Sequence, residues 1–303
     1  MCQMNRRCLL GLGALSLAAS STGRVKAQDA GAAGTAAAPQ TAEPQAAEVE
    51  DPEAEFLCST IEGVDRVGDI SGFSAATPEE NALLDRARDE YKFTPFGVAL
   101  FGNRWRKHDG LTPNTGVLTL GVHFLNGSSN QRQFFRSTVV DWTTGSLKDK
   151  VKFRFDVPVH LSQIRVSFGP GGNWSYVGRQ NLGINALEKT MNIETLNKRV
   201  CLHECGHALG LGHEHRHPNA PIVWDEDAVI ADMAAQGWSP AKTKVNILDR
   251  LTQNYACAGD PTFNPRSVML YPIPLRWTKN GFSSGQNSEL SDGDRRCVEG
   301  LYL

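Results

Sequence analysis

The stretch that decides the fold is Leu196–His217, which reads LNKRVCLHECGHALGLGHEHRH. It contains the pattern H-E-x-x-H-x-x-G-x-x-H, with histidines at His203, His207 and His213 and the glycine at Gly210. On a helix, His203 and His207 lie about 40° apart around the axis, so both imidazoles face one side. Gly210 can adopt a positive φ and end the helix, which lets the chain turn and bring His213 to the same point. The pattern therefore predicts a site with three histidine ligands.

This ligand set predicts one catalytic Zn²⁺ ion. Neutral imidazole is a good zinc ligand, and three protein ligands leave a fourth position open for water. Glu204 lies about 100° from His203, at the edge of the ligand face, where it can contact a zinc-bound water rather than the zinc. Zinc lowers the pKa of that water towards about 7, so we expect Glu204 to act as general base in amide hydrolysis. The sequence gives no support for a calcium site and leaves calcium binding open.

Two other interpretations of this stretch are less favoured. An ordinary surface helix would not explain why the whole eleven-position pattern is matched. A purely structural zinc site usually has four protein ligands, often cysteines. Cys201 and Cys205 lie about 160° from His203 on a helix, on the opposite face, so we expect them in the core or in disulfides.

The eleven-position string resembles that of the metzincin metallopeptidases, a clan that also has a Met-turn. Residues 267–271 read SVMLY and begin 54 residues after His213. The resemblance implies that Met269 forms an apolar floor beneath the zinc ligands. It also implies that Tyr271 stabilises the oxyanion, because astacins and serralysins carry a tyrosine at this position. Matrixins have a proline there, so Tyr271 favours the astacin-like side.

The residues after His213 depart from the astacin motif H-E-x-x-R-x-D-R-D. Glu214 matches, but residues 215–220, HRHPNA, do not carry its arginine and aspartates. The chain therefore resembles a microbial, secreted astacin-like or matrixin-like group. By resemblance, Glu214 would hold the mature N-terminus. We expect His215 and His217 at the surface or behind the ligands rather than on the metal.

The resemblance covers most of residues 117–303 and implies an α+β fold. The expected features are a mixed twisted sheet, an active-site helix, a zinc cleft, and a smaller irregular C-terminal subdomain that begins at His213 and ends in a helix. Apolar patterns predict strands at 117–125, 151–155, 164–168, 174–177 and 191–194, and a helix at 131–142. We expect residues 174–177 at the sheet edge, where substrate would add as a strand. Ser291 and Asp294 predict the cap of the last helix.

Residues 1–27 predict an export signal. Arg6 and Arg7 precede the apolar run 8–19, which is too short to span a membrane, and residues 25–27 offer a cleavage site. The arginine pair hints at twin-arginine export, and a short buried helix is the alternative interpretation. We therefore expect a secreted or periplasmic protein that is made as a zymogen.

The composition of the residues after the predicted signal indicates three regions. Residues 28–56 are rich in Ala, Pro and Glu, which predicts a disordered linker or pro-region. Residues 57–90 form an N-terminal or pro-segment region, in which Thr77-Pro78-Glu79-Glu80 predicts a helix start. Residues 91–303 are the expected catalytic domain.

Five cysteines remain after the predicted signal: Cys58, Cys201, Cys205, Cys257 and Cys297. An odd number leaves at least one unpaired or paired between chains. If Cys58 is set apart, the other four allow two disulfides, for example from Cys201 or Cys205 to Cys257 or Cys297. Cys58 and Asp69 are candidates for a latency switch on the zinc, as a cysteine is in matrixins and an aspartate in astacins, but neither has the surrounding family motif.

Composition excludes several classes of protein. The 303 residues carry a net charge of −2, and 40% are hydrophobic, which excludes collagen, a coiled coil and simple disorder. No basic field favours nucleic acid, and no apolar run is long enough for a membrane anchor once the signal is removed. We expect a monomer that acts on a protein or peptide substrate.

The predicted function is that of a secreted zinc metalloendopeptidase that hydrolyses peptide bonds through a zinc-activated water. Two alternatives remain open at this point. One is a zinc amidase of narrow specificity, acting for example on cell-wall peptide. The other is a secreted binding protein that keeps zinc for stability and has little turnover; a purely structural site would not need Glu204.

Overall fold

The computed structural model describes residues 99–251 and 262–302. The predicted export signal, the linker and the helix that starts at Thr77 lie outside these residues, as do Cys58, Asp69 and Cys257. In the described part of the chain, no helix has the length and apolar character needed to cross a bilayer.

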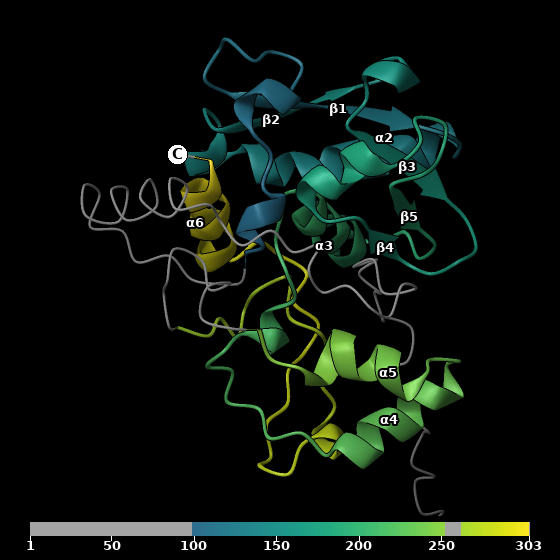
Figure 1. Ribbon diagram of the computed structural model, residues 1–303, viewed down its shortest axis with the longest axis vertical. Helices are drawn as coiled ribbons and strands as arrows, with labels where there is room; N and C mark the ends of the chain where they lie inside the picture. Colours follow the sequence, from purple (N-terminus) through teal and green to yellow (C-terminus); the bar gives the residue numbers. More distant parts are fainter. Residues whose placement is uncertain (1–98, 252–261, 303) are drawn as a thin grey trace, which may run out of the picture. The chain divides into compact units, whose positions relative to one another are not determined.

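Within residues 99–251 and 262–302, five strands form one mixed sheet in the order β2-β1-β3-β5-β4 (Figure 1). Strands β2, β1, β3 and β5 are parallel to one another, and β4 pairs antiparallel with β5 at the edge. All five lie within the ranges predicted from the sequence. Their bounds are Leu118–Phe124 for β1, Val151–Phe155 for β2, Ile164–Phe168 for β3, Trp174–Ser175 for β4 and Met191–Ile193 for β5.

The central strands β1 and β3 are largely buried, which explains their apolar sequences. All five residues of β3 are buried, and β1 is buried at five of its seven positions. Val122 of β1 lies opposite Phe155 on one side and Ile164 on the other. A strand covered on both faces needs apolar side chains throughout, and this accounts for the nearly continuous apolar run at 117–125.

Helices complete the two cores. The larger core joins the sheet to α2 (Ser129–Val139), α3 (Lys198–Ala208) and α6 (Asp292–Leu301). The predicted helix at 131–142 is thus α2 followed by a 3₁₀ turn at Val140–Thr143. The smaller core contains α4 (Glu226–Ala235) and the end of the helical segment formed by α5 (Pro240–Thr243) and Lys244–Leu248.

The smaller core is built from residues after His213, as expected for the C-terminal subdomain. Helix α6 returns from that part of the chain to the larger core, through Cys297, Val298 and Leu301. Its cap is the predicted one, because the Ser291 side chain accepts a hydrogen bond from the backbone N–H of Asp294 at 3.0 Å. The predicted α+β fold, a mixed sheet packed with helices, is confirmed.

Candidate metal centre

Helix α3 carries the first two histidines of the predicted site. It begins at a cap in which the Asn197 side chain accepts a hydrogen bond from the Val200 N–H at 2.8 Å. It ends where Gly210 adopts a φ of +97°, a conformation that favours glycine. The chain then turns back towards the helix, which is how His213 joins His203 and His207.

The three histidines meet at their Nε2 atoms. His207 Nε2 lies 3.1 Å from the Nε2 of His203 and 3.1 Å from that of His213. One ligand atom from each of the three lies within 4.8 Å of the others, and all three side chains are buried. Within residues 99–251 and 262–302, this is the group of acidic, cysteine and histidine side chains that can hold a metal ion.

Backbone carbonyls fix the tautomers of two of these histidines. His203 Nδ1 lies 2.8 Å from the Val268 carbonyl oxygen, and His207 Nδ1 lies 2.9 Å from that of Leu211. A carbonyl oxygen only accepts hydrogen bonds, so each Nδ1 carries a proton and donates it. Each neutral ring then presents the lone pair of Nε2 to the centre, as a metal ligand does.

Burial keeps these rings neutral. It lowers the pKa of His207 to about 4 and the pKa of His203 to well below its usual value. The pKa of His213 is also lowered, first by burial and then by the charges that neighbouring histidines would carry. Uncharged imidazole is the form that binds zinc.

This arrangement fits a zinc ion. The Nε2 lone pairs of His203 and His207 face each other at 3.1 Å and repel unless a cation lies between them. Zinc–nitrogen bonds of ~2.0–2.1 Å in a tetrahedron place their nitrogens about 3.3 Å apart, close to the separation found here. The donor set is also one that zinc prefers, so the chemistry and the spacing agree.

Aromatic contacts hold the third histidine. The His213 ring stacks on His215 at 5.0 Å and meets Tyr271 edge-on at 4.4 Å between ring centres. His213 Nδ1 has no hydrogen-bond partner within the described residues, so ring packing rather than a carbonyl orients this imidazole. His215 and His217 are buried rather than at the surface, and the His215 ring lies directly behind that of His213.

Met269 packs against α3 at Gly206, between the first two histidines in sequence. A Cβ built at Gly206 would lie 2.4 Å from the Met269 sulfur and 3.3 Å from the Trp142 ring. Gly206 is therefore the position that lets the Met-turn approach the helix backbone. Met269 thus packs on the helix that carries His203 and His207, and its role as the floor of the site stays a prediction. The glycine that makes room for it was not singled out from the sequence.

Replacing Gly206 by alanine is expected to lower the free energy of unfolding by about 1–3 kcal/mol, the usual effect of overpacking a core. Met269 would have to move, and zinc affinity is expected to fall with it. Urea unfolding and zinc titration measure both effects. Gly183→Ala is the matched control, because a Cβ there meets nothing within 4 Å. Equal unfolding midpoints and equal zinc affinities for the two variants would disprove this packing role.

Hydrogen bonds hold each backbone carbonyl of the Met-turn. The Val268 carbonyl accepts from His203, and the Met269 carbonyl accepts from the Glu214 N–H at 3.0 Å. The Leu270 carbonyl accepts from the buried guanidinium of Arg199 on α3 at 2.5 Å. The turn that carries Tyr271 is therefore fixed to the same helix that carries His203 and His207.

Asp294 of α6 anchors this turn from the other side. Its carboxylate accepts hydrogen bonds from the Ser267 hydroxyl at 2.5 Å and from the Val268 N–H at 3.1 Å. Asp294 was predicted only as part of the helix cap. The local sequence pattern reveals the cap, whereas the contact with a turn 26 residues away becomes visible only in the fold.

Glu204 and the two cysteines occupy the remaining parts of α3. Glu204 is fully buried beside His203 in sequence. Cys201 and Cys205 are free thiols in the core, so the expected alternative of disulfides to Cys257 or Cys297 is wrong for them. Burial raises the pKa of Cys201 to about 12, which keeps the thiol protonated and unsuited to binding zinc.

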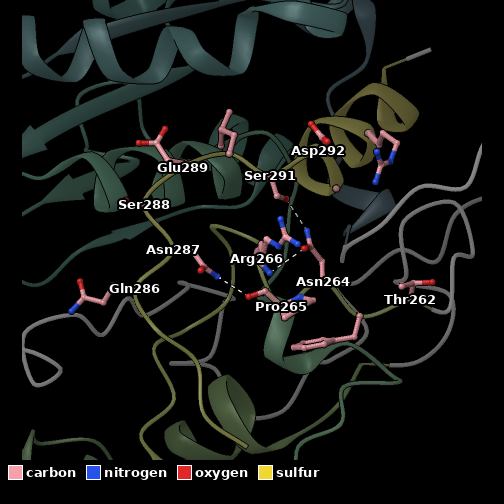
Figure 2. Close-up of a pocket in the computed structure, with 14 residues that line it drawn as sticks. Thr262, Asn264, Pro265, Arg266, Gln286, Asn287, Ser288, Glu289, Ser291 and Asp292 are labelled. Atoms are coloured by element: carbon pink, nitrogen blue, oxygen red, sulfur yellow. Dashed lines mark hydrogen bonds between the residues drawn. The ribbon is translucent and has the colours of Figure 1, made fainter.

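A separate pocket of about 760 Å³ lies between residues 262–266 and 286–293, beside the start of α6 (Figure 2). None of the three histidines lines it. Asn264 lies in its wall, where its side chain donates to the Ser291 hydroxyl at 2.8 Å and its backbone N–H donates to the Glu214 carboxylate at 2.6 Å. Through Asn264 the pocket contacts Glu214, whose own N–H holds the Met269 carbonyl, and it does not reach the three Nε2 atoms.

Comparison with known protein families gives a match that includes this centre. The sequence model of the Astacin family of peptidases matches residues 123–274, half of the chain. The matched region contains the three histidines, Glu204, Met269 and Tyr271. The match holds even though the residues after Glu214 depart from the longer astacin motif.

Individual relatives agree with this match. Bone morphogenetic protein 1 from Xenopus laevis is 27% identical over 58% of this chain, and zinc metalloproteinase nas-39 from Caenorhabditis elegans is 28% identical over 48%. The chain spans only 25% and 16% of their respective lengths. The solved structure of myroilysin is 29% identical, with a TM-score of 0.58 over 68% of this chain and 98% of that one.

Proposed function

Because the chain belongs to the astacin family of metallopeptidases, we propose that it is a secreted zinc endopeptidase. In this proposal His203, His207 and His213 bind the metal, Glu204 is the general base, and Tyr271 stabilises the oxyanion. The observation that carries the proposal is the meeting of three buried Nε2 atoms, 3.1 Å apart along two sides. A bound zinc ion accounts for three neutral imidazoles that face one another.

Zinc, when bound, supplies a Lewis acid that polarises the scissile carbonyl and makes water acidic enough to react near neutral pH. Glu204 accepts the proton of the attacking water and then gives it to the leaving amine. Its place next to His203 on α3 supports this role, because the helix directs adjacent side chains about 100° apart rather than both onto the metal. Burial of the carboxylate keeps bulk water from competing for that proton.

Tyr271 donates its hydroxyl proton in a hydrogen bond to the oxygen that becomes negative when water attacks. Support comes from its ring, which lies 4.4 Å from the His213 ring and is fully buried. The substrate backbone adds to the sheet at β4. This strand pairs only with β5 in the described sheet, so its other edge can accept an extended peptide.

The N-terminal part of the chain completes the proposal. The charged and apolar pattern of residues 1–27 supports export, and the composition of 28–56 supports a linker or pro-region. We place the catalytic domain at 91–303. Cys58 and Asp69 stay candidates for a latency switch.

Hydrolysis of an unfolded protein tests the proposed function. The zinc-loaded chain, freed of its pro-region, is expected to cut the protein at several internal peptide bonds. A chelator should abolish cleavage because the proposed reaction requires zinc, and added zinc should restore it. Mass spectrometry of the products distinguishes internal cuts from trimming at the ends.

The control is the circular dichroism of the chelated chain, which shows whether it stays folded. Folded, zinc-loaded protein that leaves unfolded proteins intact but cleaves small cell-wall peptides would replace the endopeptidase by the narrow amidase. Absence of both activities would favour a binding protein.

A further inference from the structure

The last backbone carbonyls of α3 need hydrogen-bond donors from outside the helix, because the last carbonyls of a helix have no partner inside it. The turn at Gly210 supplies two of these donors. The Gly210 N–H donates to the His207 carbonyl at 2.8 Å, and the Leu211 N–H donates to the Gly206 carbonyl at 3.0 Å. These two bonds form a Schellman motif, the usual helix ending at a glycine with positive φ.

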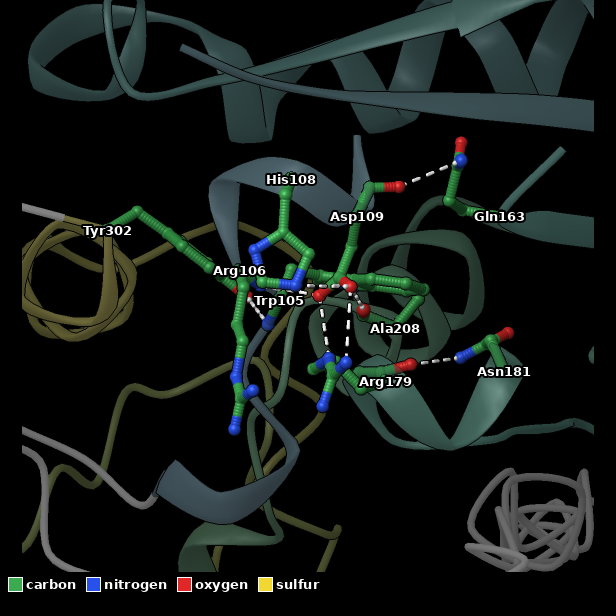
Figure 3. Close-up of polar contacts among 10 residues, drawn as sticks. Trp105, Arg106, His108, Asp109, Gln163, Arg179, Asn181, Ala208 and Tyr302 are labelled. Atoms are coloured by element: carbon green, nitrogen blue, oxygen red, sulfur yellow. Dashed lines mark hydrogen bonds and ion pairs between the residues drawn. The ribbon is translucent and has the colours of Figure 1, made fainter. Parts of the chain in front are cut away.

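The three carbonyls of residues 208–210 are left over, and each accepts a hydrogen bond from a residue far away in the sequence. The donors are, in order, the Trp105 indole at 2.7 Å, the Tyr302 hydroxyl at 2.7 Å and the Leu100 backbone N–H at 2.9 Å. Figure 3 shows the Trp105 contact with Ala208, with Tyr302 beside it. Trp105 and Tyr302 are both buried, so water does not replace these donors.

Trp105 belongs to a segment, residues 99–109, that we call the strap. Its far end is fixed by Asp109, whose carboxylate accepts from Arg179 at 2.6 and 3.2 Å. Its middle lies so close to Gly178 that a Cβ there would meet the Asn103 carbonyl at 1.9 Å. Its near end forms an antiparallel bridge between Ala99 and Leu211. The strap is therefore held along its length and cannot shift independently of the turn.

The carbonyls at 208–210 lie between two of the proposed ligands. His207 precedes them directly, and its Nδ1 donates to the carbonyl of Leu211, the next residue after them. His213 follows two residues later. A carbonyl left buried without a donor is unfavourable, so the turn would rotate to find another donor. That rotation would move the support of His207 and the position of His213 together.

We propose that Trp105 and Tyr302 are positioning residues for the metal centre, holding the turn that sets the distance between the second and third ligands. This inference rests on the proposed function, since it concerns the same zinc site. Neither residue is one of the three proposed ligands; their side chains donate to the carbonyls of Ala208 and Leu209. Their effect passes through the backbone of residues 208–210.

Zinc release from the full chain tests this proposal without any substrate. Trp105→Phe removes the indole N–H and keeps an aromatic ring, and Tyr302→Phe removes a single oxygen atom. Each variant is expected to release zinc to excess chelator about tenfold faster than the parent, because loss of an outer hydrogen bond typically weakens metal binding by about 10–100-fold. The measurement is made well below the unfolding temperature of every variant.

Trp277→Phe is the matched control. Trp277 is similarly buried, and its indole donates to Asp232 of α4 at 2.6 Å. It belongs to the smaller core, whereas Trp105 and Tyr302 belong to the larger one. The variant should lose thermal stability while keeping the parent's release rate within about twofold.

If Trp105→Phe and Tyr302→Phe release zinc at the same rate as Trp277→Phe, the inference is overturned while the proposed function stands. A parent chain that binds no zinc would overturn the proposed function and this inference with it. If Trp105→Phe does not fold, Tyr302→Phe decides the outcome.

Discussion

Replacing Glu204 by glutamine is expected to reduce kcat/KM for peptide hydrolysis by about 10³-fold while zinc stays bound. Glutamine keeps the size of the side chain but cannot accept the proton of the attacking water. General-base catalysis typically contributes about 10²–10⁴-fold, and this carboxylate is the proposed base. Because the three imidazoles remain, zinc content should be unchanged. Activity assays and metal analysis of the same preparation measure both quantities.

Glu289→Gln is the control for this substitution. Glu289 forms an exposed ion pair with Lys198, with 69% of its side chain accessible, and exposed pairs contribute little to stability. This variant should retain the parent's kcat/KM. If Glu204→Gln kept more than about a tenth of the parent's activity with a full complement of zinc, Glu204 would not be the general base.

The second large effect is expected from His213→Ala. Loss of an outer-shell partner weakens metal binding by about 10–100-fold, and loss of a ligand should exceed that range. We therefore expect zinc affinity to fall more than about 100-fold and hydrolysis to be lost at zinc concentrations that saturate the parent. Competition with a chelator of known affinity measures the first effect, and an activity assay the second.

His160→Ala is the matched control for the ligand variant, because His160 is an exposed histidine on a short 3₁₀ turn. It should bind zinc as the parent does. A His213→Ala variant with unchanged zinc affinity would show that the third ligand lies elsewhere, and the role of the Gly210 turn would have to be abandoned.

Much of this centre could be predicted from the sequence because its determinants are local. The spacing of His203 and His207 follows from helix geometry, and the turn before His213 follows from the freedom of Gly210. The strands were predictable for a similar reason, since burial on both faces leaves an apolar run that is visible in the sequence. The metzincin resemblance added Met269 and Tyr271, which no local pattern would have joined to the histidines.

The supports of the site could not be predicted in this way. Trp105, Tyr302 and Asp294 reach the centre from segments that are distant in sequence, and no periodic pattern marks such contacts. Cys201 and Cys205 lie in the core as free thiols, which is one of the two predicted alternatives; the sequence could not exclude the other, disulfides, because a count of cysteines carries no distances. The sequence did predict that both cysteines lie on the helix face opposite the histidines, and in the structure that face packs into the core.

The most direct test adds zinc stepwise to the metal-free chain, freed of its pro-region, and follows the cleavage of an unfolded protein. We predict that activity rises in proportion to the zinc added and stops rising at one zinc per chain. Glu204→Gln should bind the same amount of zinc and stay inactive in the same titration. Folded protein that takes up one zinc per chain and cleaves neither proteins nor peptides would contradict the assignment of this centre as a peptidase site.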